Sequence, residues 1–154
     1  MSEYRIVKDD LSGPEVADLL RLHLDEMHQG SPACKVHALP LERLREPDVA
    51  FWSAWDGERL AAVGALKELG AGRGELKSMR AAPEYRGRGA GEAILQHLMA
   101  EARARDYHWL GIETGRPEPF VPARRLYEKH GFAECAAFGD YVSDDFSLCM
   151  SRDL

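Results

Sequence analysis

Hydrophobic residues recur every three to four positions in three segments of the chain, and this spacing predicts amphipathic helices. The segments are residues 12–30, 89–102 and 122–131. Gly30 and Gly131 close the first and third segments, and glycine is a common residue at the end of a helix. A fourth, shorter helix is expected at residues 41–45.

Seven other segments are short and bounded by turn residues, which predicts β-strands. They are residues 3–9, 49–55, 60–69, 75–81, 109–114, 132–138 and 146–150. Asp56 and Gly57 join the second and third strands, and this dipeptide predicts a tight hairpin. The predicted order is one strand, two helices, three strands, a helix, a strand, a helix and two strands, which is an α/β (α+β) chain.

The chain between the fourth strand and the second long helix reads Tyr85-Arg86-Gly87-Arg88-Gly89-Ala90-Gly91-Glu92. Glycine at alternate positions removes the Cβ atoms that would keep a ligand away from the backbone. The start of the following helix adds unpaired N–H groups and a partial positive charge, to which Arg86 and Arg88 add formal charge. The stretch therefore predicts an anion site, for which a pyrophosphate is the natural ligand.

Two common phosphate-binding motifs do not fit this stretch. The dinucleotide fingerprint needs a third glycine where Glu92 stands, and the NTPase loop needs Gly-Lys-Ser/Thr where Gly89-Ala90-Gly91 stands. The pattern Arg/Gln-x-x-Gly-x-Gly/Ala does fit, at residues 86–91. It resembles the acetyl-coenzyme A loop of the GNAT superfamily of N-acetyltransferases, and an ordinary Gly/Arg turn is the alternative.

A second motif strengthens the resemblance. Residues 123–132 read Ala-Arg-Arg-Leu-Tyr-Glu-Lys-His-Gly-Phe, which is similar to the family's Ala-x-x-Leu-Tyr-x-x-x-Gly-Phe. The order of predicted elements is also the family's order, so the resemblance covers nearly the whole chain. It implies the GNAT fold, with a mostly antiparallel central sheet and helices on both faces. More narrowly, residues 66–69, 75–80 and 113–115 resemble a bacterial subgroup of small-molecule acetyltransferases.

Composition narrows the function classes. The 154 residues, 45% hydrophobic, suit a single domain over residues 1–154, and the net charge of −6 argues against a nucleic-acid binder. The sequence shows no membrane span or signal peptide, so a cytoplasmic protein without a membrane partner is expected. The three cysteines suggest no disulfide framework. Cys34 and His37 lack a second pair of ligands, so no metal site is predicted.

Tyr127, in the second motif, is the candidate general acid. Acetyl transfer from a thioester to an amine needs a proton for the leaving thiolate. A phenol with an intrinsic pKa of about 10 can supply that proton without a large penalty. The matching Tyr of the family flanks the cofactor's sulfur, and the alternative is a core Tyr with its hydroxyl at the surface.

Glu75 is the preferred candidate for the base that takes the proton of the amine, and Glu113 is the rival. Several family members carry a glutamate on the strand that enters the glycine loop, where Glu75 stands. Lys77 falls on the same strand face and could hold Glu75 ionised or pair with a carboxylate of the substrate. A structural salt bridge is the alternative for each glutamate.

The resemblance implies a set of contacts with acetyl-coenzyme A, the expected co-substrate. The cofactor-binding residues are Met79, Arg80, Ala81, Arg86, Gly87, Arg88, Gly89, Ala90, Gly91, Phe120 and Tyr127. The backbone of Met79 to Ala81 is expected to meet the pantetheine arm by strand-like hydrogen bonds. Phe120 stands where the family often has a cofactor-binding Asn, which puts a polar contact at that position in doubt.

Residues 28–40 are irregular and chemically varied, so they are either a helix connection or a wall of the substrate pocket. On the second interpretation His28, His37, Lys67 and Lys77 contact the substrate. Lys67, Lys77 and Arg80 lie on strands near the expected acceptor pocket, which suggests an acceptor with a carboxylate. The predicted function is transfer of acetyl from acetyl-coenzyme A to a small primary amine. A protein or peptide acceptor, and a non-catalytic acyl-coenzyme A sensor, are the alternatives, and a homodimer is possible.

Overall fold

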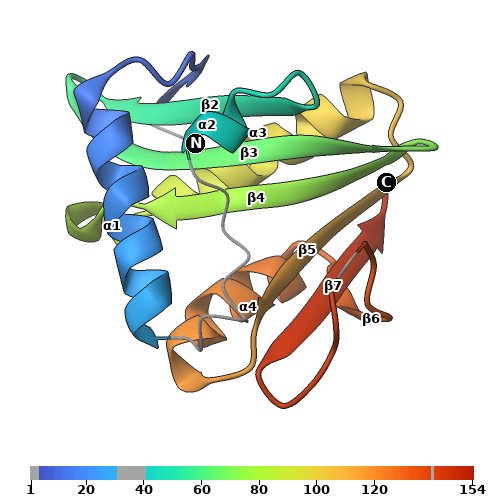
Figure 1. Ribbon diagram of the computed structural model, residues 1–154. Helices are drawn as coiled ribbons and strands as arrows, with labels where there is room; N and C mark the ends of the chain where they lie inside the picture. The colour runs from blue at the N-terminus through green and yellow to red at the C-terminus, as the bar shows by residue number, and fades with distance from the viewer. Residues whose placement is uncertain (1–3, 31–40, 140) are drawn as a thin grey trace.

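A computed structural model describes residues 4–30, 41–139 and 141–154 (Figure 1). The strands are β1 (Arg5–Lys8), β2 (Val49–Asp56), β3 (Arg59–Gly70), β4 (Arg73–Ala81), β5 (Trp109–Gly115), β6 (Ala133–Cys135) and β7 (Ser147–Asp153). The helices are α1 (Pro14–Gly30), α2 (Leu41–Leu44), α3 (Ala90–Ala104) and α4 (Val121–Lys129), with 3-10 turns η2 (Pro83–Tyr85) and η3 (Glu118–Phe120). The predicted order of helices and strands is confirmed.

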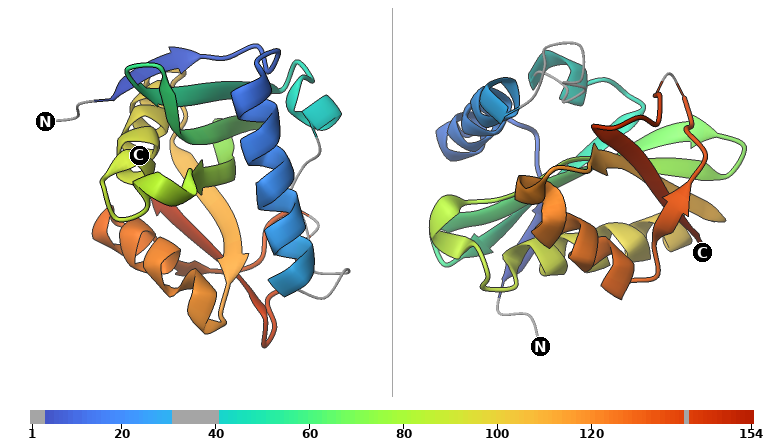
Figure 2. Two further views of the ribbon diagram at one scale, coloured as in Figure 1. Left: turned by 90° about the vertical axis from the view of Figure 1, so that its left-hand side faces the viewer. Right: turned by 90° about the horizontal axis from the view of Figure 1, so that it is seen from below.

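The seven strands form one sheet in the order β1-β2-β3-β4-β5-β7-β6. Every neighbouring pair is antiparallel except β4 and β5, which are parallel. Figure 2 shows α1 and α2 on one face of the sheet and α3 and α4 on the other. The expected α/β fold, with a mostly antiparallel sheet covered on both faces, is therefore confirmed.

The last two strands differ from the prediction in their limits. β6 has three residues instead of the expected 132–138, and β7 runs to Asp153. The Asp144 side chain accepts hydrogen bonds from the N–H groups of Phe146 (2.9 Å) and Ser147 (2.8 Å), which makes a turn directly before β7. Phe138 lies outside the observed strand, and its ring packs edge-to-face on Trp109, with ring centroids 5.1 Å apart.

The parallel strands β4 and β5 separate part of the way along the sheet. They pair at three positions, Arg73 with Trp109, Gly74 with Leu110 and Glu75 with Gly111. Beyond Glu75 the ladder ends, and Figure 1 shows the two strands diverging. The register of β4 with β3 also shifts here, where Ser78 has a φ of +54°, so a β-bulge turns β4 away from its neighbour.

The core between the sheet and α3 is packed closely around Gly64. A Cβ atom at this position would lie 2.5 Å from Ile94 Cγ2 and 2.8 Å from Met79 Sδ. The branched Ile94 side chain cannot swing away easily, because its χ1 angle is restricted in a helix. The central strand β3 therefore needs glycine here for steric reasons.

We expect Gly64→Ala to lower the free energy of unfolding by about 1–3 kcal/mol, the usual cost of an overfilled core. Denaturant unfolding followed by circular dichroism measures this loss. Gly91→Ala is the matched control, because a Cβ at Gly91 meets no heavy atom within 4 Å. Equal stabilities of the two variants would contradict the packing described for β3 and α3.

Candidate active site

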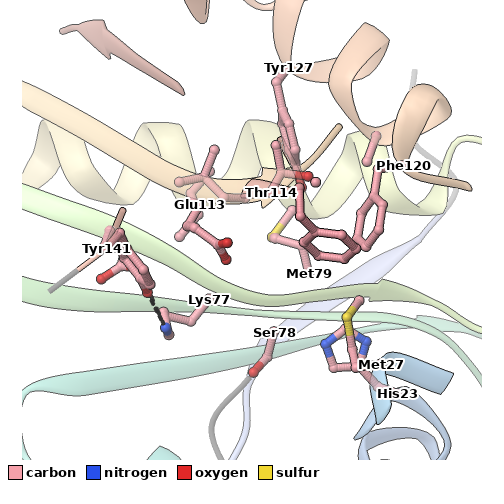
Figure 3. A pocket seen from close by; sticks show the side chains of 16 residues that line it. His23, Met27, Lys77, Ser78, Met79, Glu113, Thr114, Phe120, Tyr127 and Tyr141 are labelled. Atoms are coloured by element: carbon pink, nitrogen blue, oxygen red, sulfur yellow. Dashed lines mark hydrogen bonds and ion pairs between the residues drawn. The ribbon is translucent and has the colours of Figure 1, made fainter. Parts of the chain in front are cut away.

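A cavity of about 130 Å³ lies where β4 and β5 separate (Figure 3). The walls come from α1, β4, β5, α4 and the segment that precedes β7. The residues that carry chemistry in its lining are His23, Glu75, Lys77, Glu113, Tyr127 and Tyr141. Segments far apart in the sequence thus meet where the ladder between β4 and β5 is open.

The cavity connects the two faces of the sheet. Successive side chains of a strand point to opposite faces, and Leu76, which is 1% exposed, belongs to the apolar core. Glu75 and Lys77 therefore point to the opposite face, which α1 covers. On β5 the neighbours Ile112 and Glu113 also point to opposite faces, with Glu113 on the same face as Glu75. Tyr127 reaches the cavity from α4, on the other face. The opening thus brings Tyr127 and the carboxylates together through the sheet.

Glu75, Lys77 and Tyr141 form a buried polar network. The Tyr141 hydroxyl donates to Glu75 Oε2 at 2.5 Å and accepts from Lys77 Nζ at 2.6 Å. Lys77 Nζ also lies 3.5 Å from Glu75 Oε2. Burial lowers the pKa of Lys77, and the neighbouring Glu75 opposes that change. The network fixes the position of the Glu75 carboxylate and places a cation beside it.

Tyr127 is 4% exposed and its ring packs beside Phe132. Burial raises the pKa of Tyr127 well above its ordinary value, because a phenolate would be poorly solvated in this position. The phenol is therefore protonated at neutral pH. The raised pKa also makes the phenol a weaker acid, so its proton passes to a thiolate less readily than the intrinsic value of about 10 indicated.

The predicted anion loop has the geometry that anion binding needs. Gly87 and Gly89 have φ values of +72° and +83°, which glycine adopts without strain, and added Cβ atoms at either position would meet nothing within 4 Å. Within the described residues, the N–H groups of Gly87, Gly89, Ala90 and Gly91 have no backbone acceptor. α3 begins at Ala90, so these donors lie at the positive end of its dipole. The residues present fit a pyrophosphate group.

The basic residues of the loop are not equivalent. Arg86 Nη2 lies 3.2 Å from Glu26 Oε1, and Arg80 is paired with the same carboxylate. Arg88 stacks on Tyr85, with its guanidinium carbon 5.2 Å from the ring centroid, and its side chain is exposed. Glu26 of α1 therefore forms ion pairs both with the end of β4 and with the start of the loop.

Some of the other predicted site residues line the cavity, and others lie outside it. Met79, Lys77 and Phe120 line the cavity. Lys67 pairs across the ladder with Glu75 but does not line the cavity. Ala81 pairs with Ala62 of β3 and precedes the loop.

Two predicted substrate contacts cannot be placed. His37 lies outside the described residues, and His28 is in the last turn of α1, where the structure does not describe its side chain.

Sequence reasoning missed two groups that line the cavity. Tyr141 lies in a segment without periodic pattern, and no local signal marks it. Ser78 looks like an ordinary strand residue, and only the bulge turns it into the lining. His23 is 7% exposed and also lines the cavity.

His23 should make stability depend on pH. Burial, followed by the neighbouring Arg80 cation, lowers the pKa of His23 from 6.5 to about 4. The unfolded chain therefore binds a proton at His23 below about pH 6.5, whereas the folded chain binds it only below about pH 4. The contribution of neutral His23 to the free energy of unfolding is complete above pH 6.5 and is lost as the pH falls towards 4.

We expect about 2 kcal/mol of unfolding free energy to be lost through this group between pH 7 and pH 5. Denaturant unfolding of the His23→Leu variant and the original chain at both pH values measures the difference. The variant should lose less stability on acidification, and equal losses in the two chains would contradict the assignment.

Two other features bear on function. Among the described residues, no group of three His, Cys, Asp or Glu side chains is placed to hold a metal ion. No helix in the described ranges is long and apolar enough to cross a membrane.

Known proteins match the chain over most of its length. The profile of the acetyltransferase (GNAT) family matches residues 16–132. An uncharacterized N-acetyltransferase of Bacillus subtilis is 47% identical over 146 residues, which cover 95% of this chain and 97% of that protein. An IAA acetyltransferase of Azospirillum brasilense is 36% identical over 124 residues, 80% of each chain. A structure described as an acyl-CoA N-acyltransferase of Klebsiella pneumoniae is 28% identical, with a TM-score of 0.78 over 98% of this chain and 97% of that one.

The family profile spans the cavity-lining strands β4 and β5, the anion loop and the motif that contains Tyr127. The relatives are named as N-acetyltransferases, acetyltransferases or acyltransferases, so the chain is an acyltransferase. The chain belongs to the acetyltransferase (GNAT) family, whose enzymes take the acyl group from an acyl-CoA co-substrate.

Proposed function

We propose that this enzyme transfers acetyl from acetyl-coenzyme A to the primary amine of a small molecule. The observation that carries the proposal is the opening between β4 and β5, which joins Tyr127 on one face to Glu75 and Glu113 on the other. Acyl transfer to an amine needs a proton donor on the side of the leaving group and a proton acceptor on the side of the amine. The α4 face of the sheet supplies the proton donor, and the α1 face supplies the proton acceptor.

Acetyl-coenzyme A supplies an activated thioester, and the residues of the α3 face are suited to hold it. The N–H groups of Gly87, Gly89, Ala90 and Gly91, which have no backbone acceptor among the described residues, suit its pyrophosphate. Arg88 is an exposed cation beside them. Among the described strands, none pairs with the edge of β4 beyond Glu75 on the β5 side. The backbone of Met79 to Ala81 can therefore meet the pantetheine amides by strand-like hydrogen bonds, and Phe120 offers an apolar wall.

The residues of the cavity then have distinct roles in the transfer. The amine nitrogen forms a bond to the acetyl carbonyl carbon, the carbon–sulfur bond breaks, and the sulfur leaves as a thiolate. Tyr127 donates its phenolic proton to that thiolate. A carboxylate on the α1 face receives the proton that the amine loses, so charge and atoms balance over the reaction.

Glu75 is the base in this proposal. The Tyr141 and Lys77 contacts fix one of its oxygens, Oε2, in position. Glu113 lines the same cavity from β5 and remains the rival. Glutamine variants of Glu75 and Glu113 distinguish the two carboxylates.

The charges in the cavity favour the amine of the acceptor over a carboxylate. In the described lining, Glu75 and Glu113 lie with a single lysine, Lys77, so this end of the cavity suits an incoming amine. The two other cations that suggested a carboxylate-bearing acceptor are not available, because Lys67 does not line the cavity and Arg80 is paired with Glu26. A cavity of about 130 Å³ also suits a small acceptor, since one of about 150 Å³ holds benzene.

Thiol release from acetyl-coenzyme A tests the proposal. The enzyme is supplied with acetyl-coenzyme A and, separately, a mixture of small primary amines and a mixture of peptides with free amino termini and lysines. We expect thiol release with the small amines. Release with the peptides alone would make the acceptor a protein, and binding of coenzyme A without release from any amine would make the chain a sensor.

A further inference from the structure

His23 and Ser78 are buried polar residues that line the cavity, and each carries a polar atom without a partner among the described residues. His23 is 7% exposed and Ser78 is 8% exposed. Within the described part of the chain, neither His23 Nδ1 nor Ser78 Oγ has a hydrogen-bond partner. Figure 3 shows both residues on the α1 side of the cavity, apart from the group formed by Lys77 and Tyr141.

Such groups need an explanation, because nearly all buried polar atoms in native proteins are hydrogen-bonded. A buried donor or acceptor without a partner has lost its hydrogen bonds to water without forming new ones, which costs free energy. Two of them on the wall of one cavity indicate that the cavity receives a polar group from outside the chain.

The backbone of Ser78 is a second, independent indication. Its φ of +54° lies in the left-handed region, which residues with a Cβ atom avoid. Strained residues of this kind concentrate at ligand-binding and catalytic positions. The same strain places Ser78 in the lining of the cavity instead of in the regular strand pattern.

The chemistry of the pair selects the class of group. A neutral imidazole has one donor and one acceptor nitrogen, and a serine hydroxyl both donates and accepts. Arg80 contributes to the lowered pKa of His23, and the charge of Arg80 is balanced by its ion pair with Glu26. A neutral group that both donates and accepts hydrogen bonds matches this wall better than an anion, which only accepts.

We propose that His23 and Ser78 form a subsite for a hydroxyl or carboxamide group of the acceptor, at the other end of the cavity from the carboxylates that receive its amine. The acceptor is then an amino alcohol or an amino amide. This inference rests on the proposed function, since it presumes that the cavity holds an amine acceptor.

Amines matched in length test the subsite. Propanolamine and butylamine differ by a hydroxyl in place of a methyl, and gamma-aminobutyramide and gamma-aminobutyrate differ by a carboxamide in place of a carboxylate. We expect kcat/KM to be at least about tenfold higher for propanolamine than for butylamine, because a site built for a hydroxyl rejects the analogue that lacks it. The amide should likewise exceed the acid.

Variants assign the preference to the two residues. His23→Leu and Ser78→Gly should each bring the propanolamine-to-butylamine ratio close to one, mainly through a higher KM for propanolamine. Glycine suits the backbone at position 78, so this variant should fold. His97→Leu is the matched control, because His97 also has a buried ring nitrogen without a partner in the described structure, but it packs on Trp52 outside the cavity lining. Its ratio should equal that of the original chain.

Several results would overturn the subsite. A ratio near one in the original chain, a ratio that the two variants leave unchanged, or a preference for gamma-aminobutyrate would each remove it, the last in favour of an anion site. These results leave thiol release intact and so differ from failure of the proposed function, in which no small amine releases thiol.

Discussion

Tyr127→Phe should lower kcat by about a hundredfold or more while changing the affinity for acetyl-coenzyme A by less than about twofold. The variant removes one oxygen atom from a ring that is 4% exposed, so the packing with Phe132 is kept. Only the proton that the phenol gives to the leaving thiolate is lost. Burial raises the pKa of Tyr127, which keeps that proton in place at neutral pH until a basic thiolate forms beside it.

Steady-state thiol release measures kcat, and calorimetric titration with coenzyme A measures the affinity. Tyr107→Phe is the matched control, since Tyr107 is also a buried tyrosine, 8% exposed, and does not line the cavity. It should retain the original kcat. A Tyr127→Phe variant with unchanged kcat would remove the general-acid role, and equal losses in both variants would point to a general structural effect.

Glu75→Gln should lower kcat/KM for the acceptor by about a hundredfold or more, because an amide cannot take the proton of the amine. The side chain keeps its size, and the Tyr141 hydroxyl can still donate to the amide oxygen. Lys77 loses the carboxylate 3.5 Å from its ammonium group, so part of the effect will come from the weakened ion pair. The pH profile separates the two contributions, since loss of a base removes the acidic limb of the profile.

Glu113→Gln is the direct comparison, because Glu113 is the other carboxylate of the cavity. We expect it to lose less activity than Glu75→Gln and to keep the acidic limb. Glu68→Gln, at an exposed position of β3 outside the cavity lining, should behave as the original chain does. The reverse order, in which Glu113→Gln loses most of the activity and Glu75→Gln little, would transfer the role of base to Glu113.

The fold was predictable because its signals are local. The 3.6-residue spacing of apolar residues marked α1, α3 and α4, and the Asp56-Gly57 turn marked the β2–β3 hairpin. The glycine pattern marked the anion loop, since backbone approach to an anion needs glycine at fixed positions. The limits of β6 were missed, because the packing of Phe138 on Trp109 is a tertiary contact that no local pattern reports.

The cavity was predictable only where a motif marks it. Tyr127 and Glu75 stand in segments whose pattern indicates chemistry, and the structure places both in one lining. Tyr141 and His23 meet this cavity through the way the chain folds back, and Ser78 enters it through a bulge. Residue spacing predicts neither the chain fold that brings Tyr141 and His23 here nor the bulge at Ser78, since a bulge depends on the pairing of the whole sheet.

The central claim is that acetyl-coenzyme A lies on the anion loop and along the open edge of β4, with its thioester at the gap beside Tyr127. Backbone amide resonances followed by NMR during titration with coenzyme A test this most directly. The account predicts that the amides of Gly87, Gly89, Ala90 and Gly91 and those of residues 79–81 shift together and saturate at one affinity. If these amides stay unmoved while others shift, the coenzyme binds elsewhere and the assignment of the cavity fails.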